Sequence, residues 1–261
     1  MLTLSLDTSQ IARFLLLVCR VGGVMIAAPL IGSERVPARV KAALALMVSV
    51  VLAPVAGRPP ALGGGLELGL AAGGEVMVGL AIGFAAKLIF AAVNMAGELA
   101  DLQSAFGFAG IVSPQTQEHA SVIGQLQMSL AWLIFLGANG HHVVLHGLAA
   151  SLTAVPLGAE AGLCGPALTD ATAGLIAAAV RMAAPVVAAV LLADLALGLL
   201  TRAAPQMNLL AIGFPIKLAV GLVATMLALP LFASAARGLL WTSEAILRAV
   251  LSALGSGASY G

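Results

Sequence analysis

The chain has 261 residues, of which 61% are hydrophobic and only 9% are charged, and its formal net charge is +1. Soluble domains carry about 25% charged residues, so a mean hydropathy of +1.09 indicates a helical protein that crosses a membrane several times. The near-neutral charge excludes a nucleic-acid-binding protein of the usual basic kind. The two cysteines, Cys19 and Cys164, stand apart in or beside apolar sequence, which gives neither a disulfide framework nor a CxxC metal pair.

Six apolar runs follow one another along the chain, and each is predicted to be helical. They cover residues 11–31, 40–55, 66–96, 122–137, 171–200 and 208–232. About 20 residues are needed to cross a bilayer, so the second run is short for a span. The first ten residues lack a basic segment and contain Asp7, so we expect the first run to be retained rather than cleaved.

The C-terminal segment has a different pattern from the six runs. Between residues 236 and 254, Arg237, Trp241, Glu244 and Arg248 recur at helical spacing, with the leucines largely on other faces. This pattern predicts an amphipathic helix that lies on the membrane or on a partner protein. The last residues, 255–261, are small and polar, and we expect them to be disordered.

Basic residues gather in alternate loops if all six runs cross the membrane. Those on one side are Arg35, Arg39, Lys41, Arg202 and Lys217. The opposite loops offer little beyond Arg58. The positive-inside rule then places the amino terminus outside and the first loop in the cytoplasm.

The third run carries Glu75, Gly79, Gly83 and Lys87 at four-residue spacing, on one helical stripe. Small residues at this spacing let helix backbones approach closely, so the stripe predicts a helix–helix contact, with packing glycines favoured over a proton or ion site. Glu75 and Lys87 lie about 18 Å apart along a helix, too far to pair with each other.

A hinge is predicted between the fifth and sixth runs. Pro205 and Pro215 lack backbone donors and Gly213 frees the dihedral angles between them, so the helix pair should bend here. Asp194 lies just before the hinge, where an ionised side chain costs about 2.5–3.5 kcal/mol at a helix centre. Asp194 and Arg202 are expected to meet residues of other subunits rather than each other.

Arg202 and Lys217 leave two interpretations open. They either take part in a functional site at the hinge or cap their spans at the membrane interface, with their alkyl stems in the apolar region. The short carboxylate of Asp194 cannot reach the interface in this way, so a functional role is favoured for it.

The continuous run of apolar residues ends between residues 97 and 119, although this stretch has more large apolar side chains than loops usually contain. Its large apolar side chains are Phe106, Phe108, Ile111 and Val112, followed by Pro114. Irregular backbone survives at membrane depth only where protein or a water-filled cavity satisfies it. The composition fits either a constriction that gates by dewetting or a re-entrant loop packed in a core.

Three histidines follow the fourth run. His142 and His146 are four residues apart, a spacing that can bind zinc, but no carboxylate or cysteine accompanies them and the HExxH motif is absent. Interfacial or packing histidines are the favoured interpretation, and no metal site is predicted.

Three blocks of sequence, residues 20–54, 95–114 and 194–217, resemble the FliR family of flagellar export-gate proteins, whose injectisome counterparts are called SctT. The resemblance runs nearly end to end, and its third block is the most specific. The residues that match the family motifs are Arg20, Pro29, Pro37, Arg39, Gly97, Asp101, Gln103, Pro114, Asp194, Gly198, Arg202, Pro205, Gln206, Gly213 and Pro215.

The resemblance implies a non-enzymatic subunit without catalytic residues or cofactors, built as a single export-gate domain over residues 1–254. The family fold consists of bent helical hairpins, many of them above the plane of the bilayer. The implied partners are FliP-type and FliQ-type subunits, FlhB- and FlhA-type export proteins, membrane lipid and unfolded export substrates, within the flagellar basal body of the bacterial inner membrane.

The family also places an apolar plug in the closed pore, on the loop that aligns with Phe106, Phe108, Ile111 and Val112. Ile111 stands where the family pattern has an aromatic residue, so closure is expected to be less tight. The resemblance favours a flagellum over an injectisome.

Two functions of other classes remain as alternatives. One is a secondary transporter with Asp194 and Glu75 as its coupling carboxylates, although the internal repeats typical of such folds are not evident. The other is an intramembrane hydrolase, which is less favoured because no Ser–His pair, GxGD motif or HExxH motif can be recognised.

Overall fold

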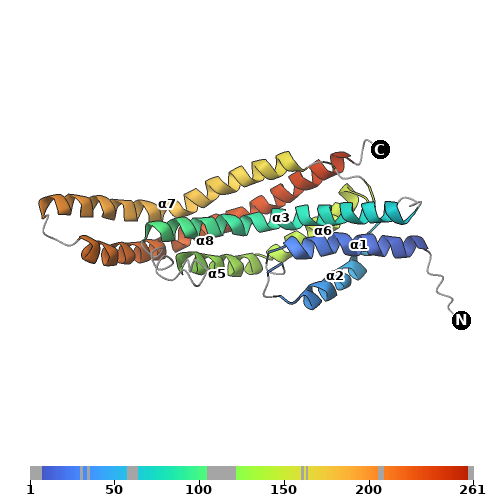
Figure 1. Cartoon of the computed structure of the whole chain (residues 1–261), viewed down its shortest axis with the longest axis horizontal. Helices are drawn as coiled ribbons and strands as arrows, with labels where there is room; N and C mark the ends of the chain where they lie inside the picture. Colours follow the sequence, from blue (N-terminus) through green and yellow to red (C-terminus); the bar gives the residue numbers. More distant parts are fainter. Residues whose placement is uncertain are drawn as a thin grey trace. The chain divides into compact units, whose positions relative to one another are not determined.

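A computed structural model describes residues 8–29, 32–33, 36–57, 64–104, 122–159, 162, 164–204 and 209–257. These residues form helices joined by turns, with no strand among them (Figure 1). The helices are α1 (Thr8–Ala27), α2 (Ala38–Leu52), α3 (Gly65–Gln103), α5 (Val122–Gly137), α6 (Gly140–Ala154), α7 (Gly165–Ala203) and α8 (Leu209–Gly257). The predicted all-α membrane fold is confirmed.

Four of the described helices are long and apolar enough to cross a membrane. The segments are Ser9–Ala27, Gly65–Gln103, Gly165–Ala203 and Ile212–Ser256, and the number rises to five if α5 and α6 together form one broken span. Helix α2 has only 15 residues, which is too short to cross. The second run is thus short for a span, as predicted, and the condition that all six runs cross is not met at α2. The orientation inferred under that condition stays a prediction.

The bounds of α3 and α6 differ from the sequence-based prediction. Helix α3 continues through residues 97–103, where a loop was expected, because the glycine and polar residues there still alternate with helix-compatible alanines and leucines. The histidine segment begins a separate helix, α6, after Asn139 adopts the left-handed conformation with a φ of 55°.

Helix α8 is one continuous element of 49 residues that runs through Pro215 and Pro230. Proline removes one backbone hydrogen bond, and apolar membrane helices tolerate that loss when neighbouring helices and side chains satisfy the freed group. The predicted C-terminal helix is therefore not separate from the sixth run, and the first three residues of the predicted disordered tail, 255–257, are helical.

The chain divides into two compact units. The first is drawn from Met1–Leu88, Asn139–Thr172 and Trp241–Gly261, and the second from Ile89–Ala138 and Ala173–Leu240. Helices α3, α7 and α8 contribute residues to both units.

In the first unit, α1 lies alongside the beginning of α3 (Figure 1). A Cβ atom on Gly79 would overlap the carbonyl oxygen of Arg20, and one on Gly83 would overlap Ala27. The predicted helix–helix contact of the glycine stripe is confirmed. Helix α2 folds back along α1, and Arg13 Nη2 donates a hydrogen bond of 2.7 Å to the carbonyl oxygen of Ala53 near the end of that hairpin.

The C-terminal part of α8 packs inside the first unit rather than on a lipid surface. Its apolar residues Leu247, Val250, Leu251 and Leu254 are buried within the chain, and Leu247 contacts the position of Gly147 on α6. The prediction that this apolar face rests on the membrane or on another protein is therefore corrected: α6 covers part of it, while Trp241 stays exposed.

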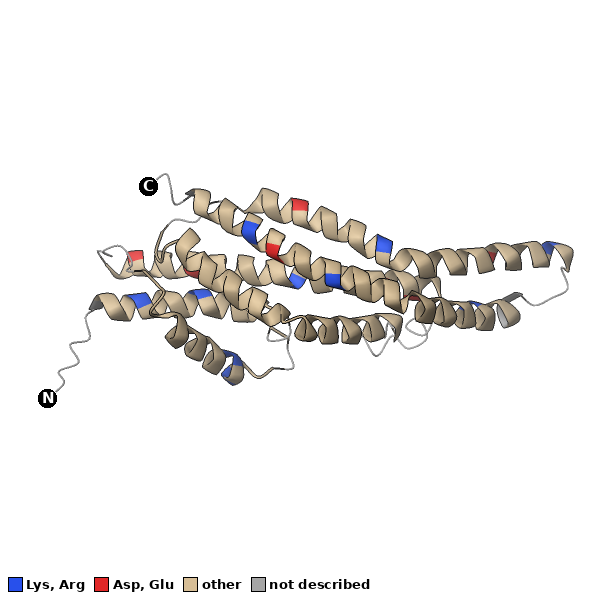
Figure 2. Ribbon diagram, turned by 180° about the vertical axis from the view of Figure 1, so that it is seen from behind, with Lys and Arg blue, Asp and Glu red and all other residues tan. Residues whose placement is uncertain are grey.

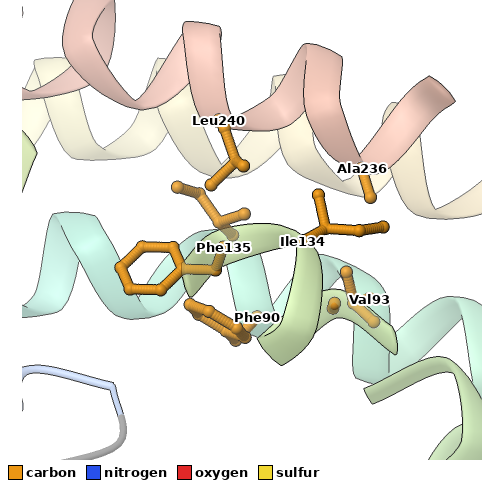
Figure 3. A pocket seen from close by; sticks show the side chains of 8 residues that line it. Phe90, Val93, Ile134, Phe135, Ala236 and Leu240 are labelled. Carbon is orange, nitrogen blue, oxygen red and sulfur yellow. The ribbon is translucent and has the colours of Figure 1, made fainter. Parts of the chain in front are cut away.

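In the second unit, the end of α3 packs antiparallel to α5. Phe90 stacks on Trp132 with ring centroids 3.9 Å apart and meets Phe135 edge-on at 5.2 Å. Figure 3 shows Phe90 and Phe135 beside a void of about 10 Å³, which Ala236 and Leu240 of α8 also line. A void of this size with an apolar lining holds no ligand and marks an ordinary packing core.

Candidate functional site

Arg20 is fully buried in the first unit and forms an ion pair with Glu75, which is 2% exposed. Arg20 Nε donates to Glu75 Oε2 over 2.5 Å. Arg20 Nη1 donates to the carbonyl oxygen of Ser151 over 2.9 Å and to its hydroxyl oxygen over 3.3 Å. Gly158 donates its backbone N–H to Glu75 Oε1 over 2.8 Å. Helices α1, α3 and α6 and the turn after α6 therefore meet at one charge pair.

Local sequence explains why this network closes. The glycine stripe on α3 brings its backbone close to that of α1, which places Glu75 within reach of Arg20. Gly158 has a φ of 76°, a conformation that other residues rarely adopt, and this turns its N–H toward the carboxylate. Among the described residues, Arg20 Nη2 is a buried donor with no acceptor.

The network bears on what Glu75 can do chemically. Both carboxylate oxygens of Glu75 already have partners in the chain, one in the guanidinium of Arg20 and one in the backbone N–H of Gly158. Figure 2 shows how few charges the long helices carry, which makes each internal pairing informative.

Asp101, near the end of α3 in the second unit, holds the start of α5. Its Oδ1 accepts the backbone N–H of Ile123 over 3.1 Å, and its Oδ2 accepts that of Gly124 over 3.3 Å. The first N–H groups of a helix have no partner inside the helix, and a carboxylate there also suits the helix dipole. Asp101 thereby links the end of α3 to the start of α5, the two helices between which the predicted plug lies in the sequence.

Close backbone packing supports the same junction. A Cβ atom on Gly97 would overlap the Cα atom of Gly124, and one on Gly221 of α8 would overlap Ser104. Ala100, Ile123 and Val186 form the buried apolar cluster beneath this junction. The end of α3 is therefore closely packed against α5 and α8.

Asp194 of α7 pairs with Lys217 of α8, with 2.8 Å between Oδ1 and Nζ. The side chains are 33% and 29% exposed, respectively. The pair joins the two arms of the hairpin formed by the end of α7 and the start of α8. Asp194 therefore has a cation in its own chain, one arm away, and the expectation that it meets residues of another subunit stays a prediction.

The other motif residues are spread over the fold. Pro29 lies in the turn after α1, Pro37 precedes α2, and Arg39 is exposed on that helix. Gln103 is half-buried at the end of α3. Gly198 and Arg202 are exposed on α7, whereas on α8 Gly213 is buried and Pro215 is exposed. The predicted residues that fall outside the described part of the chain are Phe106, Phe108, Ile111, Val112, Pro114, Pro205 and Gln206.

The histidines do not gather with other ligands. His141 and His142 contact each other edge-on with ring centroids 4.4 Å apart, and His142 and His146 are exposed on α6. Within the described residues, no group of three histidines, cysteines or carboxylates could hold a metal ion.

Sequence reasoning flagged Arg20, Glu75, Asp194 and Lys217 but missed how they pair, and it missed Ser151 as a partner altogether. The available signal was the sign of the charges: a cation in one apolar run and an anion in another have reason to meet.

The sequence of this chain matches a known protein family. Residues 11–242 match the family described as bacterial export proteins, family 1. The chain belongs to this family. The match includes the Arg20–Glu75 pair, the Asp101 junction and the Asp194–Lys217 hairpin.

Individual relatives agree with this assignment. The chain is 33% identical to the flagellar biosynthetic protein FliR of Bacillus subtilis over 80% of its own length and 83% of the relative. It is 34% identical to FliR of Escherichia coli over 82% and 83% of the two chains. The secretion system apparatus protein SsaT of Salmonella typhimurium is 31% identical over 60% of this chain and 62% of its own.

Proposed function

We propose that this chain is the FliR-type subunit of a flagellar type III export gate in the bacterial inner membrane. It assembles with FliP-type and FliQ-type subunits into the conduit for unfolded export substrates and contacts FlhB- and FlhA-type export proteins. The observation that carries this proposal is the family match over residues 11–242, together with identities of 33% and 34% to two FliR proteins over most of both chains. The shorter match to SsaT makes an injectisome the second choice.

The surface of the second unit supports a role in assembly. Large apolar side chains are exposed on both arms of the α7–α8 hairpin, among them Leu192, Leu195, Leu199, Met226 and Leu227. A surface this apolar must be covered by lipid or by other subunits. The paired charges of the helices count against an ion-coupled transporter, because both of its candidate carboxylates, Glu75 and Asp194, already face cations.

An export assay tests this function. Deletion of the chain from its own bacterium should abolish secretion of flagellar subunits and swimming, and the wild-type chain should restore both. Normal filaments in the deletion strain would contradict the proposal.

We further propose that residues 106–112 form the plug of the closed gate. Asp101 and Gly97 support this role, because they hold together the helices α3 and α5 that flank the segment, and the apolar side chains of Phe106, Phe108, Ile111 and Val112 repel water. Each buried Phe contributes roughly 1.5–3 kcal/mol to the closed form, so single truncations should loosen the plug without unfolding the protein.

Conductance and subunit recovery, measured on the same complex, test the plug. Deletion of residues 106–112, or Phe108→Ala, should leave the complex assembled but permeable to small ions. Gln115→Ala in the same stretch is the matched control and should stay sealed. A deletion complex that is intact and sealed would refute the plug, and loss of assembly without a leak would instead indicate a core-packing loop.

A further inference from the structure

In the second unit, α8 covers one side of the antiparallel pair formed by α3 and α5. The backbones of the pair are in contact at Gly97 and Gly124. Ala236 and Leu240 of α8 line the void on the covered side, next to Ile134 of α5 (Figure 3). The opposite side of the pair is therefore a separate surface.

This opposite surface is polar. Within the second unit, the exposed residues of α3 form one narrow row with spacings of three and four residues. The members of the row are Ala91, Asn94, Glu98 and Leu102. On α5, Gln125 and Ser129 are exposed four residues apart. We call Asn94, Glu98, Gln125 and Ser129 the polar face.

Helix geometry places these four residues on the same side of the pair. Counted from Gly97, the two on α3 lie about 60° and 100° around the helix, and counted from Gly124, the two on α5 lie about 100° and 140° around in the same sense. Residues turned in the same sense on two antiparallel helices lie on one side of the pair. Ile89 and Ile134, which line the void beside α8, lie about 80° in the opposite sense.

The four residues also lie at the same level along the helices. Because Gly97 lies opposite Gly124, Gln125 is level with the interval between Asn94 and Glu98, and the polar face is about 9 Å long. Asn94 Nδ2 donates to Glu98 Oε1 over 2.6 Å, and Ser129 Oγ donates to the carbonyl oxygen of Gln125 over 2.8 Å. The two amide side chains together offer donors and acceptors to a further molecule.

The composition of the polar face suits neither lipid nor a contact between subunits. Polar and ionised groups in membrane proteins face protein or water-filled space, because their exposure to hydrocarbon is costly. The buried centres of subunit interfaces are depleted of glutamate, serine and alanine, yet these types occur here as Glu98, Ser129 and Ala91. The exposed Leu126 and Leu133 of α5 lie about half a turn from the contact with α3, outside this face. Water is the environment that fits the polar face.

We propose that the polar face lines the export conduit and contacts the unfolded polypeptide as it passes. Amide and hydroxyl groups can bond the peptide backbone, which is common to all substrates, so the contact does not select a sequence. An extended chain rises about 3.3 Å per residue, so the face contacts about three residues at a time. The inference rests on the proposed export function and does not depend on the plug.

Photocrosslinking to an arrested substrate tests the contact in the intact complex. An export substrate fused to a stably folded domain is arrested in the gate of the living bacterium. A benzophenone amino acid replaces Asn94, Gln125 or, as the matched control on the same helix as Gln125, Leu133. We expect the first two positions to crosslink to the substrate several-fold more than Leu133. Crosslinks from Asn94 and Gln125 to another subunit or to lipid instead, or equal crosslinking of the substrate from Leu133, would overturn the proposal.

An export measurement adds a second test. The double variant Asn94→Leu/Gln125→Leu should lower the export rate several-fold while the recovery of the complex is unchanged, because its side chains no longer bond the peptide backbone. Leu133→Met exchanges one exposed apolar side chain for another and should leave the rate unchanged. Wild-type export by the double variant, or a loss of the complex that accounts for the lower rate, would overturn the role of the polar face alone. An arrested substrate that does not purify with the complex would overturn the export function as well.

Discussion

Arg20 and Glu75 illustrate how a charge can be kept inside an apolar helix bundle. Both side chains are buried, and between them they bind Ser151 and the backbone N–H of Gly158. Removal of one partner from a buried pair leaves an uncompensated charge, whereas removal of both does not. The pair should therefore respond very differently to single and double substitution.

Arg20→Met should lower the free energy of unfolding by about 3–5 kcal/mol, because the ionised Glu75 is left without a cation. The double variant Arg20→Met/Glu75→Gln should recover part of this loss, since its amide oxygen can still accept from Gly158. Denaturant titration in mixed micelles measures both. Arg39→Ala, at an exposed cation, is the control and should change the value by less than about 0.5 kcal/mol. A single variant as stable as the wild type would show that the pair does not stabilise the fold.

The Asp194–Lys217 pair is half-exposed in the isolated chain and should be tested by exchange of its charges. Asp194→Lys alone and Lys217→Asp alone each place like charges opposite each other, so we expect reduced assembly and export in both. The double exchange restores an ion pair and should recover most of the activity. If the double exchange is no better than the single variants, other subunits rather than this contact determine the role of Asp194.

At the scale of elements, the contact between α1 and α3 depends on the absence of side chains. A Cβ atom on Gly79 would overlap the backbone of α1, which cannot move as a flexible side chain can. Gly79→Ala should therefore destabilise the protein by about 1–3 kcal/mol.

Gly73, six residues earlier on the same helix, has open space around it. Gly73→Ala should stabilise the protein by about 0.4–1 kcal/mol, because alanine restricts the unfolded chain. The thermal unfolding temperatures of purified Gly79→Ala and Gly73→Ala, compared with that of the wild type, test both expectations. The same shift in both would mean that helix propensity, and not helix contact, governs these positions.

The junction between α3 and α5 depends on one carboxylate. Asp101→Ala removes the acceptor for the N–H groups of Ile123 and Gly124 and should cost about 0.5–2 kcal/mol, as for other helix caps. Hydrogen exchange should become faster at these two amides first. Leu102→Ala, at an exposed neighbour, should leave their exchange unchanged; equal acceleration in both variants would contradict the local role of Asp101.

The positions of the helices followed from hydrophobicity, but several of their ends did not. The fourth run was predicted at the observed bounds of α5, because glycine and polar residues flank it on both sides. The sixth run was predicted to end near Pro230, because proline removes a backbone hydrogen bond. Helix α8 continues through Pro230, since a packed apolar helix tolerates that loss. Composition alone does not show which of these environments applies.

At the scale of the whole molecule, the candidate site could be predicted only in part. Charged residues in apolar runs identified Glu75 and Asp194 as costly and therefore important. Their partners, Arg20 and Lys217, lie 55 and 23 residues away in the sequence, and pairing over such distances depends on how helices pack. The residues of the predicted plug lie outside the described part of the chain, so their role stays a proposal.

The exposed apolar side chains on α2, α7 and α8 predict that the chain is unstable when it is made without its partner subunits. Some of this surface faces lipid, but an export-gate subunit must use much of it to bind other subunits. Expressed without FliP-type and FliQ-type proteins, the chain should be degraded or aggregate, and its steady-state level should rise several-fold when they are co-expressed. An unchanged level would indicate that lipid alone covers these faces.

The identity of the bound subunits tests the central claim most directly. The tagged chain is purified from its own bacterium in mild detergent, and the proteins that accompany it are identified by mass spectrometry. An export-gate subunit should be recovered in a stable complex with one FliP-type and one FliQ-type protein, each in several copies. A monodisperse monomer, active or stable without these proteins, would contradict the account and favour a transporter.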